Sequence, residues 1–109
     1  MDYCIILNTT SNIDEAKKIA YSLVESKLAA CVNIIPKMIS IYSWKEDIWE
    51  DEEYLIIIKT RKDNFEPVKD KIKALHSYEL PEIVMLKLED GFKDYLDWIG
   101  KETIIPESK

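Results

Sequence analysis

Apolar positions along the 109-residue chain alternate between strand-like runs and helix-like spacing. Apolar runs rich in β-branched residues predict four strands, at 2–9, 29–44, 54–60 and 80–88. Apolar residues that recur every three or four positions predict three helices, at about 13–28, 63–75 and 92–99. The tail, 103–109, is a candidate for one further short strand.

This order of elements, β-α-β-β-α-β with an additional C-terminal helix, is typical of the ferredoxin-like α+β fold. Its two crossover helices lie on one face of a four-stranded antiparallel sheet. The first strand then lies between the third and fourth, and the second strand, at an edge, forms a long hairpin with the third. The length and the absence of a linker predict a single domain, 1–109.

Local signals place some of the element ends. Asn12, with Glu15 three residues later, is a typical N-terminal capping pair for the first helix. Either Asp63 or Asn64 can cap the second helix. Pro36 interrupts the second strand, and because proline cannot donate to a sheet ladder, it predicts an edge or a bulge there.

The strand "YLIIIKT" is apolar on both of its faces. Ile56 and Ile58 point one way, whereas Leu55 and Ile57 point the other. Two helices cover only one face of a sheet, so the second face requires another cover, and a further copy of the chain is the natural one. We therefore predict an obligate homo-oligomer. The C-terminal helix is expected to cover part of this face with its inward stripe, Phe92, Tyr95, Leu96 and Ile99.

Charge and composition exclude several classes of protein. The net charge of −6 would repel a phosphate backbone, so a nucleic-acid partner is not expected. No apolar run is long enough to span a membrane, and the N-terminus lacks the basic segment of a signal peptide, so we expect a cytoplasmic protein. Two cysteines match neither a disulfide scaffold nor a zinc motif.

The segment "ALHSYELPEI" contains the only histidine, His76. One interpretation is a histidine that ends a helix and interacts with the helix dipole. The other is a metal ligand, joined by oxygen from Glu79 or Glu82 and by thiolate from Cys31, a set that suits copper or zinc. Cys31 can equally be a small buried apolar residue, and no base beside it is visible that would activate it as a nucleophile.

Further chemistry is sparse. Tyr42, Trp44 and Trp49 gather around the hairpin, where they serve either for packing and subunit contact or as a stacking platform for a ligand. The acidic run "WEDEE" is interpreted as a solvated strand segment. The first strand is not followed by a phosphate-binding loop with glycine and arginine, and we do not expect an enzyme.

Five motifs occur in order along the chain: "LAACVNIIP", "SIYSW", "DEEYLIIIKT", "HSYELPEI" and "YLDWI". Together they resemble the CutA divalent-cation tolerance family. The resemblance implies a tight homotrimer of ferredoxin-like subunits, similar in architecture to PII signalling proteins. It also implies a role in tolerance of divalent metals, with Cu(II) or another divalent cation as ligand and no cofactor needed for folding.

The resemblance assigns the family's motif residues to Cys31, Trp44, Lys59, His76, Tyr78, Pro81 and Glu82. An alternative function is a PII-like sensor that binds a small anionic ligand in an intersubunit cleft with Trp44, Lys59 and Tyr78, where Lys59 and Arg61 supply charge. A third is a structural trimer that acts through protein partners. This chain departs from the family pattern at Ser77, where proline is usual.

A second departure lies in the hairpin turn, where the family usually has glycine and this chain has Glu46. The turn must then be built differently, and we expect Asp47 to take the positive φ.

Overall fold

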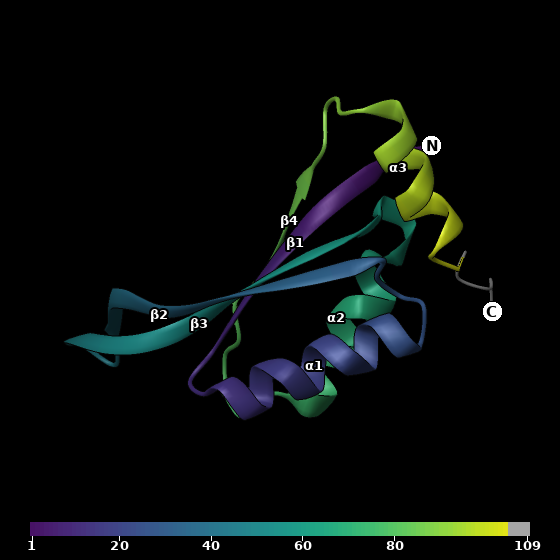
Figure 1. Ribbon diagram of the computed structural model, residues 1–109. Coiled ribbons are helices and arrows are strands. Elements are labelled where there is room, and N and C mark those ends of the chain that lie inside the picture. Colours follow the sequence, from purple (N-terminus) through teal and green to yellow (C-terminus); the bar gives the residue numbers. More distant parts are fainter. Residues whose placement is uncertain (105–109) are drawn as a thin grey trace.

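The computed structural model describes residues 1–104 and shows an α+β chain with a four-stranded antiparallel sheet and three α-helices (Figure 1). The sheet order is β2-β3-β1-β4, which confirms the predicted topology. In chain order the elements are β1 (Tyr3–Thr10), α1 (Ile13–Glu25), β2 (Cys31–Trp44), β3 (Asp47–Arg61), a 3-10 turn (Lys62–Asn64), α2 (Phe65–Leu75), β4 (Ile83–Lys87) and α3 (Lys93–Lys101). The strand proposed for the tail falls largely on 105–109, outside the described residues.

The element ends follow local hydrogen bonding. The predicted cap of α1 is confirmed, because Asn12 Oδ1 accepts a hydrogen bond from the Glu15 N–H at 2.8 Å. Asn64 occupies the N-cap position of α2 without capping it; its side chain instead donates inward to the Leu28 carbonyl. β3 begins seven residues earlier than predicted, at Asp47, because the acidic segment pairs with β2 through backbone groups that do not depend on side-chain charge.

Helices α1 and α2 cover one face of the sheet (Figure 1). Ile6, Ile56 and Ile58 from the central strands are fully buried there. The helices contribute a matching apolar set, Ala16, Ile19, Leu23, Val68 and Ile72. This core orients the sheet and thereby fixes which side chains reach its other face.

The opposite side of the sheet, the open face, carries a continuous apolar surface. Its residues come from alternate positions of all four strands: Ile5, Leu7, Ile35, Leu55, Ile57, Val84 and Leu86. The register places Leu7 opposite both Ile57 and Val84, so the side chains are neighbours across strands. Val84 and Leu86 are 47% and 55% exposed in the single chain. The prediction of a strand that is apolar on both faces is therefore confirmed.

Helix α3 covers only one end of the open face. Of its predicted inward stripe, Ile99 is buried and Leu96 is half-buried, whereas Phe92 and Tyr95 are exposed. The prediction was wrong for these two residues because α3 is short and lies over the start of β1, where it contacts little of the sheet. Among residues 1–104, no other element covers the rest of this apolar surface. None of the described helices has the length and hydropathy needed to cross a membrane.

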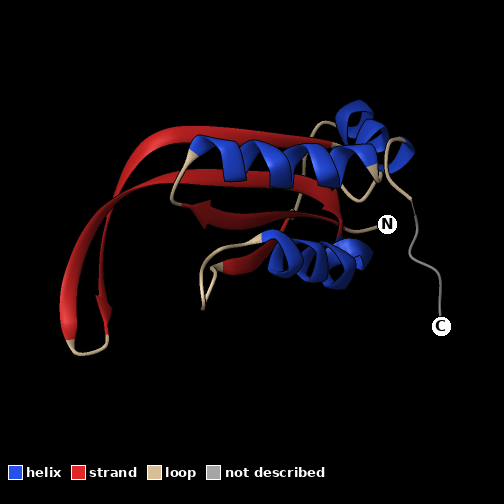
Figure 2. Cartoon of the chain, turned by 90° about the horizontal axis from the view of Figure 1, so that it is seen from below, coloured by secondary structure: helices blue, strands red, loops and turns tan. Residues whose placement is uncertain are grey.

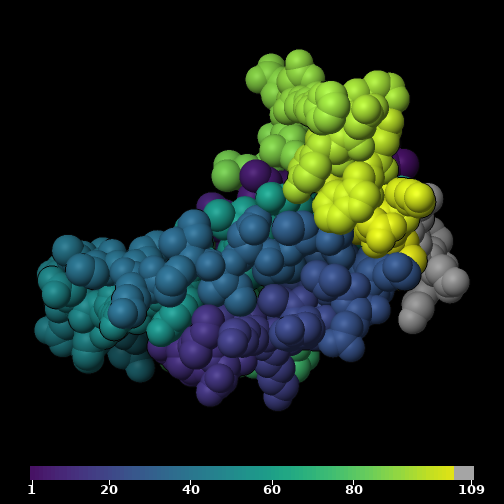
Figure 3. Space-filling view, viewed as in Figure 1, coloured from purple at the N-terminus to yellow at the C-terminus, as the bar shows by residue number. Residues whose placement is uncertain are grey.

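Strands β2 and β3 continue past the sheet as a curved hairpin arm (Figures 2 and 3). The register shifts between Ile35 and Met38, which confirms the irregularity predicted at Pro36. On one side of the arm Ile39, Ile41 and Ile48 are 69%, 68% and 76% exposed. An arm with such large exposed apolar residues is suited to contact a second molecule.

The tip of the arm is a two-residue turn in which Lys45 has a φ of 51° and Glu46 a φ of 70°. The expectation that Asp47 takes the positive φ was wrong, because Asp47 already pairs with Trp44 in the ladder. Positive φ at both loop positions is the type I′ turn, one of the two common two-residue connections between paired strands.

We expect Glu46→Gly to raise the free energy of unfolding by about 1 kcal/mol, because glycine adopts positive φ without the steric cost of a Cβ. Chemical denaturation at equal protein concentration measures the change. Asp47→Gly is the control and should lower stability, since that residue is a strand position without positive φ. Equal effects of the two substitutions would contradict the explanation.

Candidate functional site

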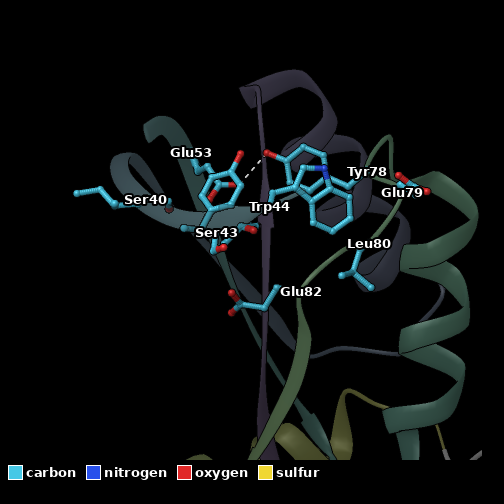
Figure 4. A pocket seen from close by; sticks show the side chains of 11 residues that line it. Ser40, Ser43, Trp44, Glu53, Tyr78, Glu79, Leu80 and Glu82 are labelled. Atoms are coloured by element: carbon cyan, nitrogen blue, oxygen red, sulfur yellow. Dashed lines mark hydrogen bonds between the residues drawn. The ribbon is translucent and has the colours of Figure 1, made fainter. Parts of the chain in front are cut away.

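A pocket of about 580 Å³ lies between the hairpin arm and the loop that joins α2 to β4 (Figure 4). The arm contributes aromatic and hydroxyl side chains, and the loop contributes a tyrosine and two carboxylates. The lining residues are Thr9, Ser40, Ile41, Tyr42, Ser43, Trp44, Glu53, Tyr78, Glu79, Leu80 and Glu82. The pocket therefore joins sequence segments that are more than 20 residues apart.

Glu53 and Tyr78 connect the two walls of the pocket. The Tyr78 hydroxyl donates to Glu53 Oε2 at 2.7 Å, as the dashed line in Figure 4 shows. Burial, and then the hydrogen bond to Glu53, raises the pKa of Tyr78 far above its ordinary value. Tyr78 therefore remains a neutral donor at any physiological pH and holds the glutamate in place. A second pair lies on the arm, where the Tyr42 hydroxyl donates to Asp51, and this bond raises the pKa of Tyr42.

His76 is the C-cap of α2, and its side chain is fully buried. Its Nδ1 accepts a hydrogen bond from the Tyr78 backbone N–H at 3.0 Å. The remaining ring proton is then on Nε2, which donates to the Thr9 carbonyl at 2.6 Å. The prediction that His76 ends a helix is confirmed, and both ring nitrogens are engaged in fixing the loop. A metal ion could bind His76 only after the Tyr78 N–H leaves Nδ1.

The other predicted metal ligands lie in different places. Glu79 is exposed and 4.0 Å from Lys45, and Glu82 is exposed on the pocket wall. Cys31 starts β2 opposite Lys59, which pairs with Ile5. His76 contacts Thr9, four residues further along β1, or about 13 Å at the usual rise of a strand.

Within one chain, therefore, Cys31 does not join the histidine loop. Among residues 1–104, no three histidine, cysteine or acidic side chains converge on a point where they could hold a metal ion.

The predicted anion cleft is only partly assembled within the chain. Trp44 and Tyr78 do line one pocket. Lys59 does not, because its ammonium group lies 5.7 Å from the ring centre of Tyr95 on α3. Arg61 is buried and donates to Thr103 and Gly100, so its charge is already occupied.

The pocket has an acidic character that the sequence analysis did not assign. Three of its lining residues, Glu53, Glu79 and Glu82, are carboxylates, and none is lysine or arginine. Glu53 was placed in a solvated acidic strand, yet it is only 8% exposed. Strand alternation is the sequence signal for its burial, because residue 53 points to the same face of β3 as the apolar residues 55 and 57. A cation suits this pocket better than an anion does.

The topology, the long arm and the pocket between arm and loop together define a small ferredoxin-like α+β protein with an apolar open face. Comparison with known proteins refines this class. The family described as CutA1 divalent ion tolerance protein matches residues 4–102. The chain therefore belongs to the CutA1 family, as its sequence motifs predicted.

Three relatives illustrate the match. The chain is 44% identical over 99 residues to the divalent-cation tolerance protein CutA of Thermus thermophilus, covering 91% of this chain and 96% of that one. It is 46% identical to the protein CutA homolog of Xenopus laevis, covering 91% of this chain but only 64% of that longer protein. The crystal structure of CutA1 from Oryza sativa superposes with a TM-score of 0.93 at 36% identity, covering 95% of each chain.

Proposed function

We propose that this chain forms a cytoplasmic homotrimer that binds divalent cations, Cu(II) most tightly, and contributes to tolerance of them without catalysing a reaction. The observation that carries the proposal is the open face, an apolar surface that spans all four strands and that α3, within the described chain, covers only at one end. The name of the family, divalent ion tolerance protein, supports the class of ligand.

The arm supports a closed assembly. Its exposed isoleucines, Ile39, Ile41 and Ile48, lie beyond the region that α1 and α2 cover. An arm that reaches onto the next copy makes a head-to-tail contact, and such contacts close into a ring when the rotation between copies permits. A ring of three satisfies every arm and every open face.

The metal site in this proposal takes ligands from more than one copy, because residues 1–104 of a single chain hold no converging set of three. Glu79 and Glu82 are exposed beside the pocket, and Cys31 starts an edge strand, so assembly can bring one copy's cysteine to another copy's loop. Cu(II) leads the divalent ions in affinity at most such sites.

The test is calorimetric titration of Cu(II) and Zn(II) into the assembled protein and into Ile57→Asp, a variant designed to prevent assembly. We expect Cu(II) affinity to fall at least tenfold in Ile57→Asp, about 1.4 kcal/mol, and likewise in Glu79→Gln with Glu82→Gln. Glu25→Gln with Asp70→Asn, which removes two exposed carboxylates on α1 and α2, is the charge-matched control and should bind as the parent does. Full affinity in a single-chain variant would contradict the shared site.

A further inference from the structure

We propose that the pocket between the arm and the 76–82 loop binds a linear organic amine, a di- or polyamine with primary or secondary ammonium groups. This ligand class is separate from the divalent cations proposed above. Three features of the pocket favour this ligand class: a buried carboxylate on its wall, the aromatic rings that line it, and a lysine of the chain itself at its rim.

Glu53 supplies the charge. Glu53 is buried on the pocket wall, and Tyr78 donates to only one of its two oxygens, Oε2. Among the hydrogen bonds of residues 1–104, none reaches Oε1. A buried carboxylate with a free oxygen facing a cavity favours a positively charged hydrogen-bond donor, and such charge-assisted bonds are the strong ones.

Three aromatic residues, Tyr42, Trp44 and Tyr78, line the same cavity. Aromatic faces attract alkylammonium groups and pack against methylene chains, so they suit a ligand that alternates the two. A smaller inorganic ion would leave these rings without a contact.

Lys45 gives an example of this chemistry at the rim. Its ammonium group lies 5.6 Å from the Trp44 ring centre and 4.0 Å from Glu79 Oε2. The side chain is itself a primary amine on a four-carbon chain, and it lies near an aromatic ring and a carboxylate at an exposed position. An amine ligand would make the same two kinds of contact deeper in the pocket, with Glu53 in place of Glu79.

The remaining features of the pocket favour a primary or secondary ammonium group over a metal ion and over a quaternary ammonium. A metal ion requires several converging ligands, which residues 1–104 do not offer, whereas an ammonium group requires one carboxylate and a ring face. Ser40 also lines the pocket, on the same side of the arm as Glu53, and a serine hydroxyl accepts from N–H donors, which a quaternary ammonium lacks. The volume of about 580 Å³ is in the range of small-molecule sites and accommodates a chain of several methylenes.

The test is calorimetric titration of spermidine into the assembled protein and into two variants that lose the same charge. Glu53→Gln should weaken binding at least tenfold, because the amide keeps the shape of the side chain but not its charge. Glu52→Gln is the matched control and should change affinity less than twofold, since Glu52 pairs with Ile39 on the other side of the arm. Circular dichroism confirms that both variants keep the parent fold.

Further outcomes discriminate between occupants. Trp44→Leu should weaken spermidine binding about fivefold, and tetramethylammonium should compete poorly. Equal losses of spermidine affinity in Glu53→Gln and Glu52→Gln would mean that only the net charge of the protein matters, and would overturn the proposal. The absence of binding at millimolar spermidine would also overturn it. Binding to Ile57→Asp but not to the assembled parent would also overturn it, because a neighbouring copy would then fill the pocket. None of these results depends on whether Cu(II) binds.

Discussion

Replacing Ile57 by aspartate is expected to convert the assembled protein into single chains of 12.8 kDa. Ile57 lies in the middle of the open face, between Leu7 on β1 and Asn33 on β2. In an assembly that covers this face, the substitution would bury an unpaired carboxylate in every subunit, at a cost of several kcal/mol each. Light scattering at dilute concentration should give three times 12.8 kDa for the parent and the single-chain mass for the variant.

The adjacent residue provides the sharpest comparison. Ile56 is fully buried under the helices, so Ile56→Asp should unfold the chain rather than separate subunits, with loss of its far-ultraviolet dichroism. Tyr21→Asp, at an exposed position of α1, should leave both fold and mass unchanged. A parent protein that is folded and monomeric, or an Ile57→Asp variant of unchanged mass, would contradict the homotrimer.

The sequence was most informative where an element has a strict period. Alternation in β3 separated Ile56 from Ile57 correctly, because side chains of a strand must point to opposite faces. The start of β3, in contrast, was predicted seven residues too late. Backbone pairing with β2 continues through the acidic segment, and an apolar pattern does not reveal this pairing, because the partner strand lies elsewhere in the sequence.

The site was predicted in part. Trp44, Tyr78, Glu79 and Glu82 do line one pocket. Cys31 and Lys59 do not join them in a single chain, because the register of β2 on β3 sets them at the other end of the sheet. The hydrogen bonds of the His76 ring could not be predicted either. They go to the Thr9 carbonyl and the Tyr78 N–H, and because every residue has such backbone groups, the sequence does not indicate which ones a side chain will contact.

Arg61 shows how a charge of the predicted anion cleft serves the fold instead. Its guanidinium group is buried and donates to Thr103 Oγ1 at 2.8 Å and to the Gly100 carbonyl, which ties the end of β3 to the C-terminal part of α3. A Cβ on Gly100 would lie 2.6 Å from Tyr3 Oη, so a larger residue there would require the tyrosine side chain to move. The arginine and this close approach together hold α3 against the sheet.

We therefore expect Arg61→Ala to lower the free energy of unfolding by about 3 kcal/mol, because hydrogen bonds from a charged group to Thr103 and Gly100 are lost and a buried side chain leaves a cavity. Urea denaturation at equal protein concentration measures the loss. Arg61→Lys should recover little of it, since an ammonium group cannot reproduce the planar fork that reaches two acceptors. Lys62→Ala, at the exposed neighbouring position, should stay within about 0.5 kcal/mol of the parent. If Arg61→Ala keeps full stability and instead loses affinity for a small anion, Arg61 is a ligand-binding charge, and its role in holding α3 is refuted.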